Sequence, residues 1–214
     1  MRISLIGMAG SGKSFWSSAI SEKGYLRYCC DDMIEERLSL RSEKKRKGDG
    51  TTGMGRWMGY PFDSSYENHE EEYLSSERSV LQEILLQLEP MDEEKEQKIV
   101  VDTAGSVIYT GKEILKKLRQ NTTVVYLSIP LAVRKQLLEA YLSKPHPLIW
   151  NGLFHQNEGE SSMQALARCY ENLVSSREVL YERYANVIIP NHLRRRDGFD
   201  AEDFLHEVLT QINR

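Results

Sequence analysis

Cysteine is scarce in this chain of 214 residues, which contains only Cys29, Cys30 and Cys169. Two of them are adjacent and one is left over, so a disulfide framework is not expected and a reducing compartment fits better. Neither the C-x-x-C nor the H-E-x-x-H spacing occurs. The sequence therefore lacks these common metal and redox motifs.

Long hydrophobic runs are also missing. The apolar run Ile3–Ile6 follows directly on Met1 and Arg2, and it is far too short for a signal peptide or a membrane-spanning helix. The formal net charge is −4, so no basic excess points to a nucleic acid or an acidic membrane as a partner. With 40% apolar and 28% charged residues, the composition is typical of a soluble globular protein, and we expect it in the cytoplasm.

Short apolar runs alternate with helical patterns along the chain. Strands are expected at Arg2–Ile6, Tyr25–Cys30, Lys98–Asp102, Thr122–Leu127 and Asn186–Pro190. Helices are expected at Lys13–Glu22, Glu70–Glu89, Gly111–Arg119, Leu131–Leu142 and Ser161–Tyr184, with a last helix capped by Asp200 whose apolar face is Phe204, Leu205, Val208, Leu209 and Ile212. This alternation predicts a single α/β domain over residues 1–214, with a central parallel sheet between layers of helices.

Two stretches interrupt the alternation. Residues 40–68 are first basic, over Arg41–Lys47, and then rich in glycine; residues 143–160 carry Pro145 and Pro147. Loops of this length inside a compact domain are usually lids, binding loops or disordered segments.

Residues 7–14 read GMAGSGKS and match the P-loop pattern G-x-x-x-x-G-K-[ST] at every defined position. They follow an apolar strand and open a helix in which Phe15, Trp16 and Ile20 are expected to pack inward. Such a loop points backbone N–H groups at phosphate oxygens, helped by the helix dipole. The predicted nucleotide-binding residues are Gly7, Gly10, Ser11, Gly12, Lys13, Ser14 and Phe15. Lys13 would neutralise the β- and γ-phosphates of ATP, and the Ser14 hydroxyl would bind Mg²⁺.

Acidic side chains follow the second and third predicted strands. Asp31 and Asp32 end one run, and Asp102 ends the other. Ligands of open parallel sheets bind beyond the carboxyl ends of the strands, so these carboxylates could hold magnesium or accept a proton from an attacking hydroxyl. Asp31 or Asp32 could instead cap a helix that starts near Met33. Asp102 is the favoured magnesium-linked residue.

One charge interrupts the apolar face of the long C-terminal helix. Met163, Leu166, Tyr170, Leu173, Arg177, Leu180 and Tyr184 recur at steps of three and four. A guanidinium turned inward needs an anionic partner, because an unpaired desolvated charge is costly. That partner could be a substrate or phosphate group, or a structural carboxylate.

Together these features resemble the shikimate kinase family of P-loop small-molecule kinases. The matching segments are Ile6–Ser14, Asp31–Glu35 (D-x-x-I-E), Val124–Leu127 and Arg177–Tyr181 (R-x-x-L-Y). The resemblance covers most of the chain and implies a three-layer fold with a five-stranded sheet of order 2-3-1-4-5. It further implies that Asp31 contacts the substrate and the proton that is transferred, and that Arg177 binds the substrate carboxylate.

The chain departs from the family at four places. Cys29 stands where the family has a second aspartate, and Leu74 stands where it has an arginine that clamps the substrate. The segment Asp102–Ser106 replaces a glycine triplet, within which we assign Gly105 to the acceptor site. The lid arginine has no clear equivalent, since Lys144 or His146 is all that the segment offers. Shikimate as the substrate therefore does not follow, because planar arginines are what recognise a carboxylate.

We interpret the chain as an ATP- and Mg²⁺-dependent kinase that phosphorylates a hydroxyl of a small, anionic acceptor. Residues 31–89 would bind the acceptor and residues 143–160 would form a lid, while the oligomeric state stays open. The D-x-x-G segment Asp102–Gly105 also fits a GTPase-type switch, although no N-K-x-D motif follows the fourth strand. A P-loop ATPase or a binding module without kinase activity is a further alternative.

Overall fold

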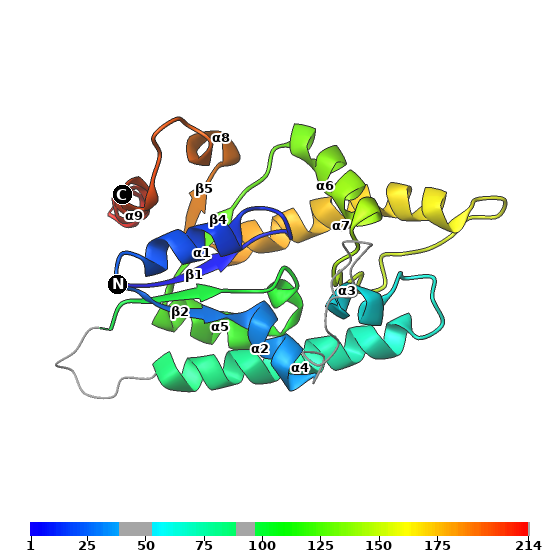
Figure 1. The fold of residues 1–214 in the computed structure, drawn as a ribbon, viewed down its shortest axis with the longest axis horizontal. Helices are drawn as coiled ribbons and strands as arrows, with labels where there is room; N and C mark the ends of the chain where they lie inside the picture. The colour runs from blue at the N-terminus through cyan, green and yellow to red at the C-terminus, as the bar shows by residue number, and fades with distance from the viewer. Residues whose placement is uncertain (39–52, 89–96, 214) are drawn as a thin grey trace.

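The protein is described from a computed structural model, and the structure describes residues 1–38, 53–88 and 97–213. Its centre is a five-stranded sheet in which every pairing is parallel, with the order β2-β3-β1-β4-β5 (Figure 1). The strands are β1 (Arg2–Ile6), β2 (Leu26–Cys29), β3 (Ile99–Asp102), β4 (Thr123–Leu127) and β5 (Val187–Ile189). This confirms the predicted fold and strand order, and it brings the carboxyl ends of all five strands to one edge.

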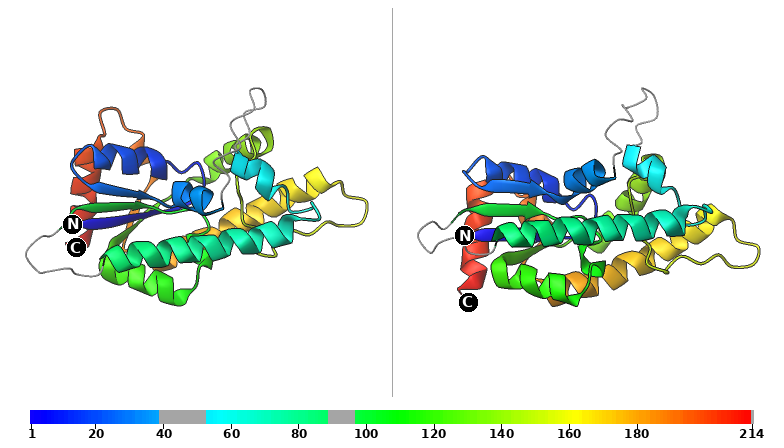
Figure 2. Two further views of the ribbon diagram at one scale, coloured as in Figure 1. Left: turned by 60° about the horizontal axis from the view of Figure 1, so that its bottom comes forward. Right: turned by 90° about the horizontal axis from the view of Figure 1, so that it is seen from below.

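Helices cover both faces of the sheet and make three layers. They are α1 (Lys13–Ser21), α2 (Cys30–Arg37), α3 (Gly53–Met58), α4 (Tyr66–Leu88), α5 (Lys112–Asn121), α6 (Leu131–Ser143), α7 (Ser162–Tyr184), α8 (Asn191–Arg194) and α9 (Ala201–Ile212), with a 3-10 turn η2 (Val107–Tyr109). Figure 2 shows α1 and α9 on one face, with α4 and α5 on the other.

The two faces of the sheet bury two separate apolar clusters. Val100 and Val125 face Trp16 of α1 and Phe204 of α9. The opposite faces of the same strands belong to a larger cluster, which α4, α5 and α7 cover. Because the side chains of a strand alternate between the faces, strands buried on both sides read as continuous apolar runs, which is how the sequence revealed them.

Three sequence-based expectations about local structure are wrong. Phe15 does not pack inward, since 67% of its surface is exposed. Neither Asp31 nor Asp32 is a helix cap, because α2 begins at Cys30 with Cys29 at the N-cap, so both aspartates lie in the first turn, where the helix dipole favours negative charge. Leu209 and Ile212 of α9 are each 46% exposed, whereas the predicted cap Asp200 accepts hydrogen bonds from two backbone N–H groups of that helix.

Part of the glycine-rich stretch is also helical. Residues 53–58 form α3, with Met54 and Met58 buried one turn apart, and α4 begins at Tyr66, before the predicted start. Two glycines in α3 lower its helix propensity, so its packing is what holds it. Gly55 allows the closest contact, because a Cβ there would lie 2.2 Å from the Pro145 carbonyl oxygen. The basic run 41–47 lies outside the described residues.

Candidate functional site

The P-loop lies at the carboxyl edge of the sheet, between β1 and α1. Gly7, Gly10 and Gly12 have φ values of 145°, 79° and 97°, which side chains with a Cβ rarely adopt. Space is tight as well, since a Cβ at Gly10 would lie 2.6 Å from Cδ2 of Leu137 on α6. The glycines therefore permit both the curl of the loop and the close approach of α6.

Lys13 is buried and folds back over its own loop. Its ammonium group donates to the carbonyl oxygens of Gly7 (3.0 Å) and Met8 (3.1 Å). Burial lowers the pKa of Lys13, and the negative charges of Asp31 and Asp102 oppose that shift. Phosphate oxygens of a bound nucleotide could replace these two carbonyl oxygens as the hydrogen-bond acceptors of Lys13. Ser14 and Phe15 follow on the exposed first turn of α1.

Arg194, which sequence reasoning missed, supports the P-loop from behind. Its guanidinium donates to the carbonyl oxygens of Ser11 (2.6 Å), Ser128 (2.5 Å) and Ile189 (3.1 Å). It therefore ties the loop to the ends of β4 and β5. Burial lowers the pKa of Arg194 to about 10.

Asp102 lies at the end of β3, against the first turns of α1. Its Oδ2 accepts hydrogen bonds from Ser17 Oγ (3.0 Å) and from Arg27 Nη2 (2.9 Å). Its Oδ1 is buried and has no hydrogen-bond partner. Arg27 is a second residue that sequence reasoning missed.

This arrangement fits a magnesium ion that binds together with a nucleotide. No group of three or more potential metal-ligating side chains occurs in the described part of the chain. Mg²⁺ usually binds through one or two carboxylates together with substrate phosphates, so a larger set of ligands is not needed. The unpartnered Oδ1 of Asp102 and the hydroxyl of Ser14 are the oxygens on offer.

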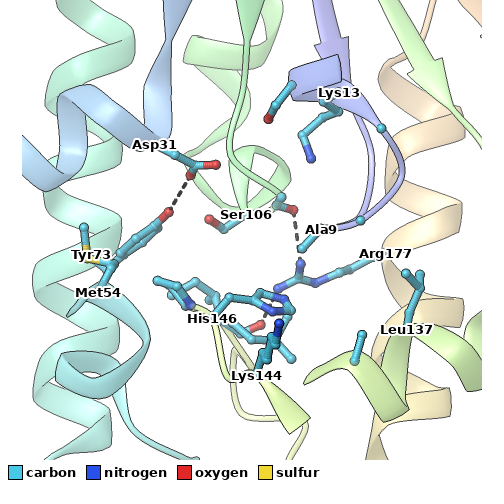
Figure 3. Close-up of a pocket in the computed structure, with 18 of the residues that line it drawn as sticks. Ala9, Lys13, Asp31, Met54, Tyr73, Ser106, Leu137, Lys144, His146 and Arg177 are labelled. Atoms are coloured by element: carbon cyan, nitrogen blue, oxygen red, sulfur yellow. Dashed lines mark hydrogen bonds between the residues drawn. The ribbon is translucent and has the colours of Figure 1, made fainter. Parts of the chain in front are cut away.

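A cavity of about 590 Å³ extends from the P-loop (Figure 3). It brings together residues that are far apart in the sequence. The P-loop and α1 supply Ala9, Gly10, Gly12, Lys13, Ser14 and Phe15; α2 to α4 supply Asp31, Glu35, Met54 and Tyr73; the segment after β3 supplies Gly105 and Ser106; α6 to α7 supply Leu137, Ala140, Ser143, Lys144, His146, Pro147, Leu148, Ile149 and Arg177. Of the predicted site residues, Gly7, Ser11 and Asp102 are not among those that line it.

Asp31 faces Lys13 across this cavity. The Tyr73 hydroxyl donates to Asp31 Oδ1 (3.1 Å) and fixes the direction of the carboxylate. Asp31 is open to the cavity, but the surrounding protein limits its hydration and raises its pKa, while the charge of Lys13 opposes the shift. A carboxylate with a raised pKa is a better proton acceptor than an ordinary aspartate.

Arg177 is a buried cation at the cavity wall, with 1% of its surface exposed. It donates to the carbonyl oxygens of Gly105 (3.2 Å) and Ile149, and it lies 5.2 Å from the centre of the Tyr109 ring. Its Nε has no hydrogen-bond partner. Among the residues that the structure describes, no carboxylate forms an ion pair with Arg177. The alternative that Arg177 pairs with a structural carboxylate is therefore not seen among the described residues.

Glu77 of α4 is fully buried behind this wall and was not predicted as a site residue. Its Oε2 accepts a hydrogen bond from Ser106 Oγ (2.5 Å), and its Oε1 has no partner. Burial raises the pKa of Glu77 to about 8; the bond from Ser106 lowers it and Asp31 raises it further.

The segment 143–160 closes one side of the cavity. Burial, and after it the charge of Lys13, lowers the pKa of His146 to about 4, so this histidine is neutral near pH 7. Lys144 is exposed. Trp150 is buried, and its backbone N–H donates to Glu70 Oε1 of α4 (2.6 Å).

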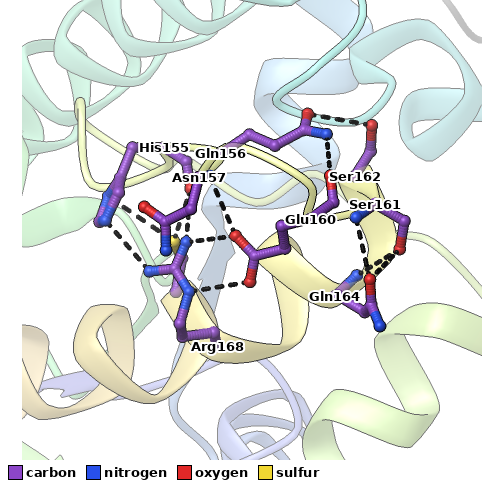
Figure 4. Close-up of polar contacts among 9 residues, drawn as sticks. His155, Gln156, Asn157, Glu160, Ser161, Ser162, Gln164 and Arg168 are labelled. Carbon is purple, nitrogen blue, oxygen red and sulfur yellow. Dashed lines mark hydrogen bonds and ion pairs between the residues drawn. The ribbon is translucent and has the colours of Figure 1, made fainter.

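The far half of the same segment is held by α7. Arg168 forms an ion pair with Glu160 (2.7 Å) and donates to the His155 carbonyl oxygen (2.9 Å), as Figure 4 shows. The segment is therefore packed against two helices in this structure.

Only the comparison with solved structures bears on the fold. No family model matches the sequence, and no curated protein matches it significantly. A shikimate kinase from Acinetobacter baumannii in complex with shikimate is 21% identical, with a TM-score of 0.59 over 99% of this chain and 92% of that chain. The shikimate kinase from Bacteroides thetaiotaomicron is 16% identical (TM-score 0.58; 100% and 94% covered), and that from Aquifex aeolicus is 19% identical (TM-score 0.57; 100% and 96% covered).

At these identities the likeness shows the fold alone. The chain has the shikimate kinase-like P-loop fold, as its sequence predicted. No helix among the described residues is long and apolar enough to cross a membrane.

Proposed function

We propose that this protein is an ATP- and Mg²⁺-dependent kinase, which transfers the γ-phosphoryl group to a hydroxyl of a small, anionic acceptor. One observation carries the proposal: a single cavity joins the P-loop lysine Lys13, the carboxylate of Asp31 and the buried guanidinium of Arg177. A phosphate site, a proton acceptor and an anion site are the three parts that such a transfer requires.

Lys13 would exchange its bonds to the carbonyls of Gly7 and Met8 for bonds to the phosphate oxygens. Bound Mg²⁺ would neutralise charge on the β- and γ-phosphates, held by Ser14 and by Oδ1 of Asp102 either directly or through water. Phe15 is exposed beside this site, where it can contact the nucleotide.

The acceptor would bind between Asp31 and Arg177, beside Gly105, within the segment 31–89. Asp31 takes the proton of the attacking hydroxyl as the new P–O bond forms, while the bond between the γ-phosphorus and the β–γ bridging oxygen breaks and ADP leaves. Arg177 holds the anionic group of the acceptor, because a buried cation without a carboxylate partner is stabilised by an anionic ligand. The segment 143–160 acts as the lid that keeps out water, which otherwise competes as acceptor.

A GTPase-type switch is the alternative. In such a switch the Asp102–Gly105 segment moves with the state of the nucleotide. Here the Gly105 carbonyl accepts hydrogen bonds from both Arg177 and the Tyr181 hydroxyl (2.5 Å), which ties the segment to α7 and favours the kinase.

The test is a screen for phosphorylation. The protein is incubated with ATP and Mg²⁺ and with a panel of shikimate, sugar acids and nucleoside monophosphates, and ADP release is measured against an acceptor-free blank. A kinase gives ADP in proportion to a new phosphate monoester seen by ³¹P NMR, and Lys13→Ala gives neither. Turnover of GTP but not ATP, or ADP release that no panel member changes, would contradict the proposal.

A further inference from the structure

Ser106 occupies a central place in the acceptor end of the cavity. In Figure 3 it lies between Asp31 and Arg177, and it lines the cavity together with them. The Ser106 hydroxyl oxygen is 2.5 Å from Glu77 Oε2, so Ser106 already makes one hydrogen bond with this buried carboxyl group. What Ser106 offers to a ligand therefore depends on Glu77.

Glu77 sits among several ionisable groups from four helices, and among the described residues no cation forms an ion pair with it. The ionisable groups that act on it are Lys13 of α1, Cys30 and Asp31 of α2, Tyr73 of its own helix α4, and Arg177 and Tyr181 of α7. Its Oε1 is buried without a hydrogen-bond partner. An ionised carboxylate is costly at such a position, whereas a protonated one costs much less.

A serine hydroxyl has one hydrogen to donate and lone pairs to accept with. If Glu77 is ionised, the hydrogen of Ser106 must point to Glu77, and only lone pairs face the cavity. If Glu77 is protonated, it can donate to Ser106 Oγ, and the hydrogen of Ser106 is free to turn toward the cavity. The protonated pair suits an anionic oxygen bound beside Arg177, and the ionised pair repels it.

We propose that Ser106 donates to the anionic group of the acceptor beside Arg177, and that Glu77 is a positioning residue, which holds one proton while the acceptor is bound. This inference rests on the proposed function, because it concerns the acceptor of that reaction. The proton comes from solvent and resides on the Glu77 carboxyl group, so no other reactant is needed. The hydrogen bond to Ser106 and the unpartnered Oε1 carry the assignment.

The proposal predicts a specific pH dependence. Burial raises the pKa of Glu77 to about 8, so the free protein carries a protonated Glu77 at pH 7 and an ionised one at pH 9.5. Below about pH 7 the acceptor KM is independent of this group. Above pH 8, binding must draw in one proton, so the KM rises by up to about tenfold per pH unit.

The experiment measures the acceptor KM at saturating ATP and Mg²⁺ from pH 6.5 to 9.5, with the hydroxy acids shikimate and gluconate as probes. Glu77→Gln keeps the shape of the side chain, and its amide N–H₂ donates to Ser106 at every pH, so its KM should stay flat above pH 8. Ser106→Ala removes the donor and should raise the KM about tenfold at pH 7 while flattening its rise. Glu35→Gln is the matched control: it removes another cavity carboxylate, and its KM should still rise above pH 8.

The possible outcomes distinguish a wrong role for Glu77, a wrong contact for Ser106 and a wrong class of acceptor. If wild type phosphorylates a probe and Glu77→Gln shows the same rise in KM as wild type, the role of Glu77 is wrong and the kinase proposal stands. If Ser106→Ala keeps the wild-type KM at pH 7, the contact with Ser106 is wrong. If wild type phosphorylates neither probe at any pH, the hydroxy-acid acceptor fails, and this inference fails with it. Circular dichroism at each pH shows whether Glu77→Gln is folded, and Ser106→Ala carries the test if it is not.

Discussion

Replacing Arg177 by methionine separates recognition of the acceptor from stability of the fold. The methionine keeps much of the apolar stem but removes the charge and the hydrogen bonds to the carbonyl oxygens of Gly105 and Ile149 and to the sulfur of Met8. Gly105 keeps the bond from Tyr181, so the Ile149 carbonyl alone loses its donor. An unpartnered buried carbonyl costs about 1–3 kcal/mol, and removal of a desolvated charge offsets part of this. We therefore expect the stability of Arg177→Met to lie within about 2 kcal/mol of wild type.

The effect on the reaction should be larger. Truncating one partner of a buried charge pair costs about 2–5 kcal/mol, which corresponds to a fall in kcat/KM for the acceptor of about thirtyfold to several-thousandfold. Steady-state kinetics at saturating ATP measures this fall, and urea unfolding followed by circular dichroism measures the stability. Arg177→Lys keeps the charge without the planar fork, so its loss should be intermediate.

Two results would refute this reasoning. A folded Arg177→Met protein with kcat/KM within threefold of wild type would show that no anionic group binds there. A protein that fails to fold would show that Arg177 mainly holds Gly105 and Ile149 together.

Three further predictions follow from the same contacts. Lys13→Ala should abolish ADP release while far-UV circular dichroism stays that of the folded protein; normal turnover would rule out the P-loop site. The folded pKa of Glu77 is raised from 4.5 to about 8, so the folded state holds more protons than the unfolded state, and stability should fall as pH rises through this window, by at most about 5 kcal/mol. Urea unfolding at pH 5 and pH 9 measures that loss, and equal losses in wild type and Glu77→Gln would contradict it. Gly55→Ala places a methyl group against Pro145, so thermal unfolding should show a destabilisation of about 1–3 kcal/mol, whereas an unchanged Tm would mean that this contact is loose.

The sequence predicted the three central strands β1, β3 and β4 because they are buried on both faces, so each reads as a short apolar run that local pattern alone can reveal. The P-loop could be recognised as directly, since its glycines and Lys13 all lie within the short segment 7–14. Asp31 was singled out at the end of a predicted strand and Arg177 as the one charge in the apolar stripe of a predicted helix, and the resemblance to a known family then supplied their expected roles. These parts share one property: the information lies within a few neighbouring residues.

The missed residues act across long separations in the chain. Arg194 donates a hydrogen bond to the Ser11 carbonyl oxygen, and Arg27 donates one to Asp102. Glu77 accepts a hydrogen bond from Ser106. Each of these contacts depends on how the helices and strands pack. The short helix α3 was missed because its glycines lower its helix propensity, and tertiary contacts are what stabilise it.

The most direct test of the central claim is titration of the protein with ATP in the presence of Mg²⁺, followed by calorimetry. We predict saturable binding that weakens strongly without Mg²⁺ and disappears in Lys13→Ala. If the folded wild-type protein binds neither ATP nor GTP with Mg²⁺, the phosphate site does not exist and the proposed kinase activity is wrong.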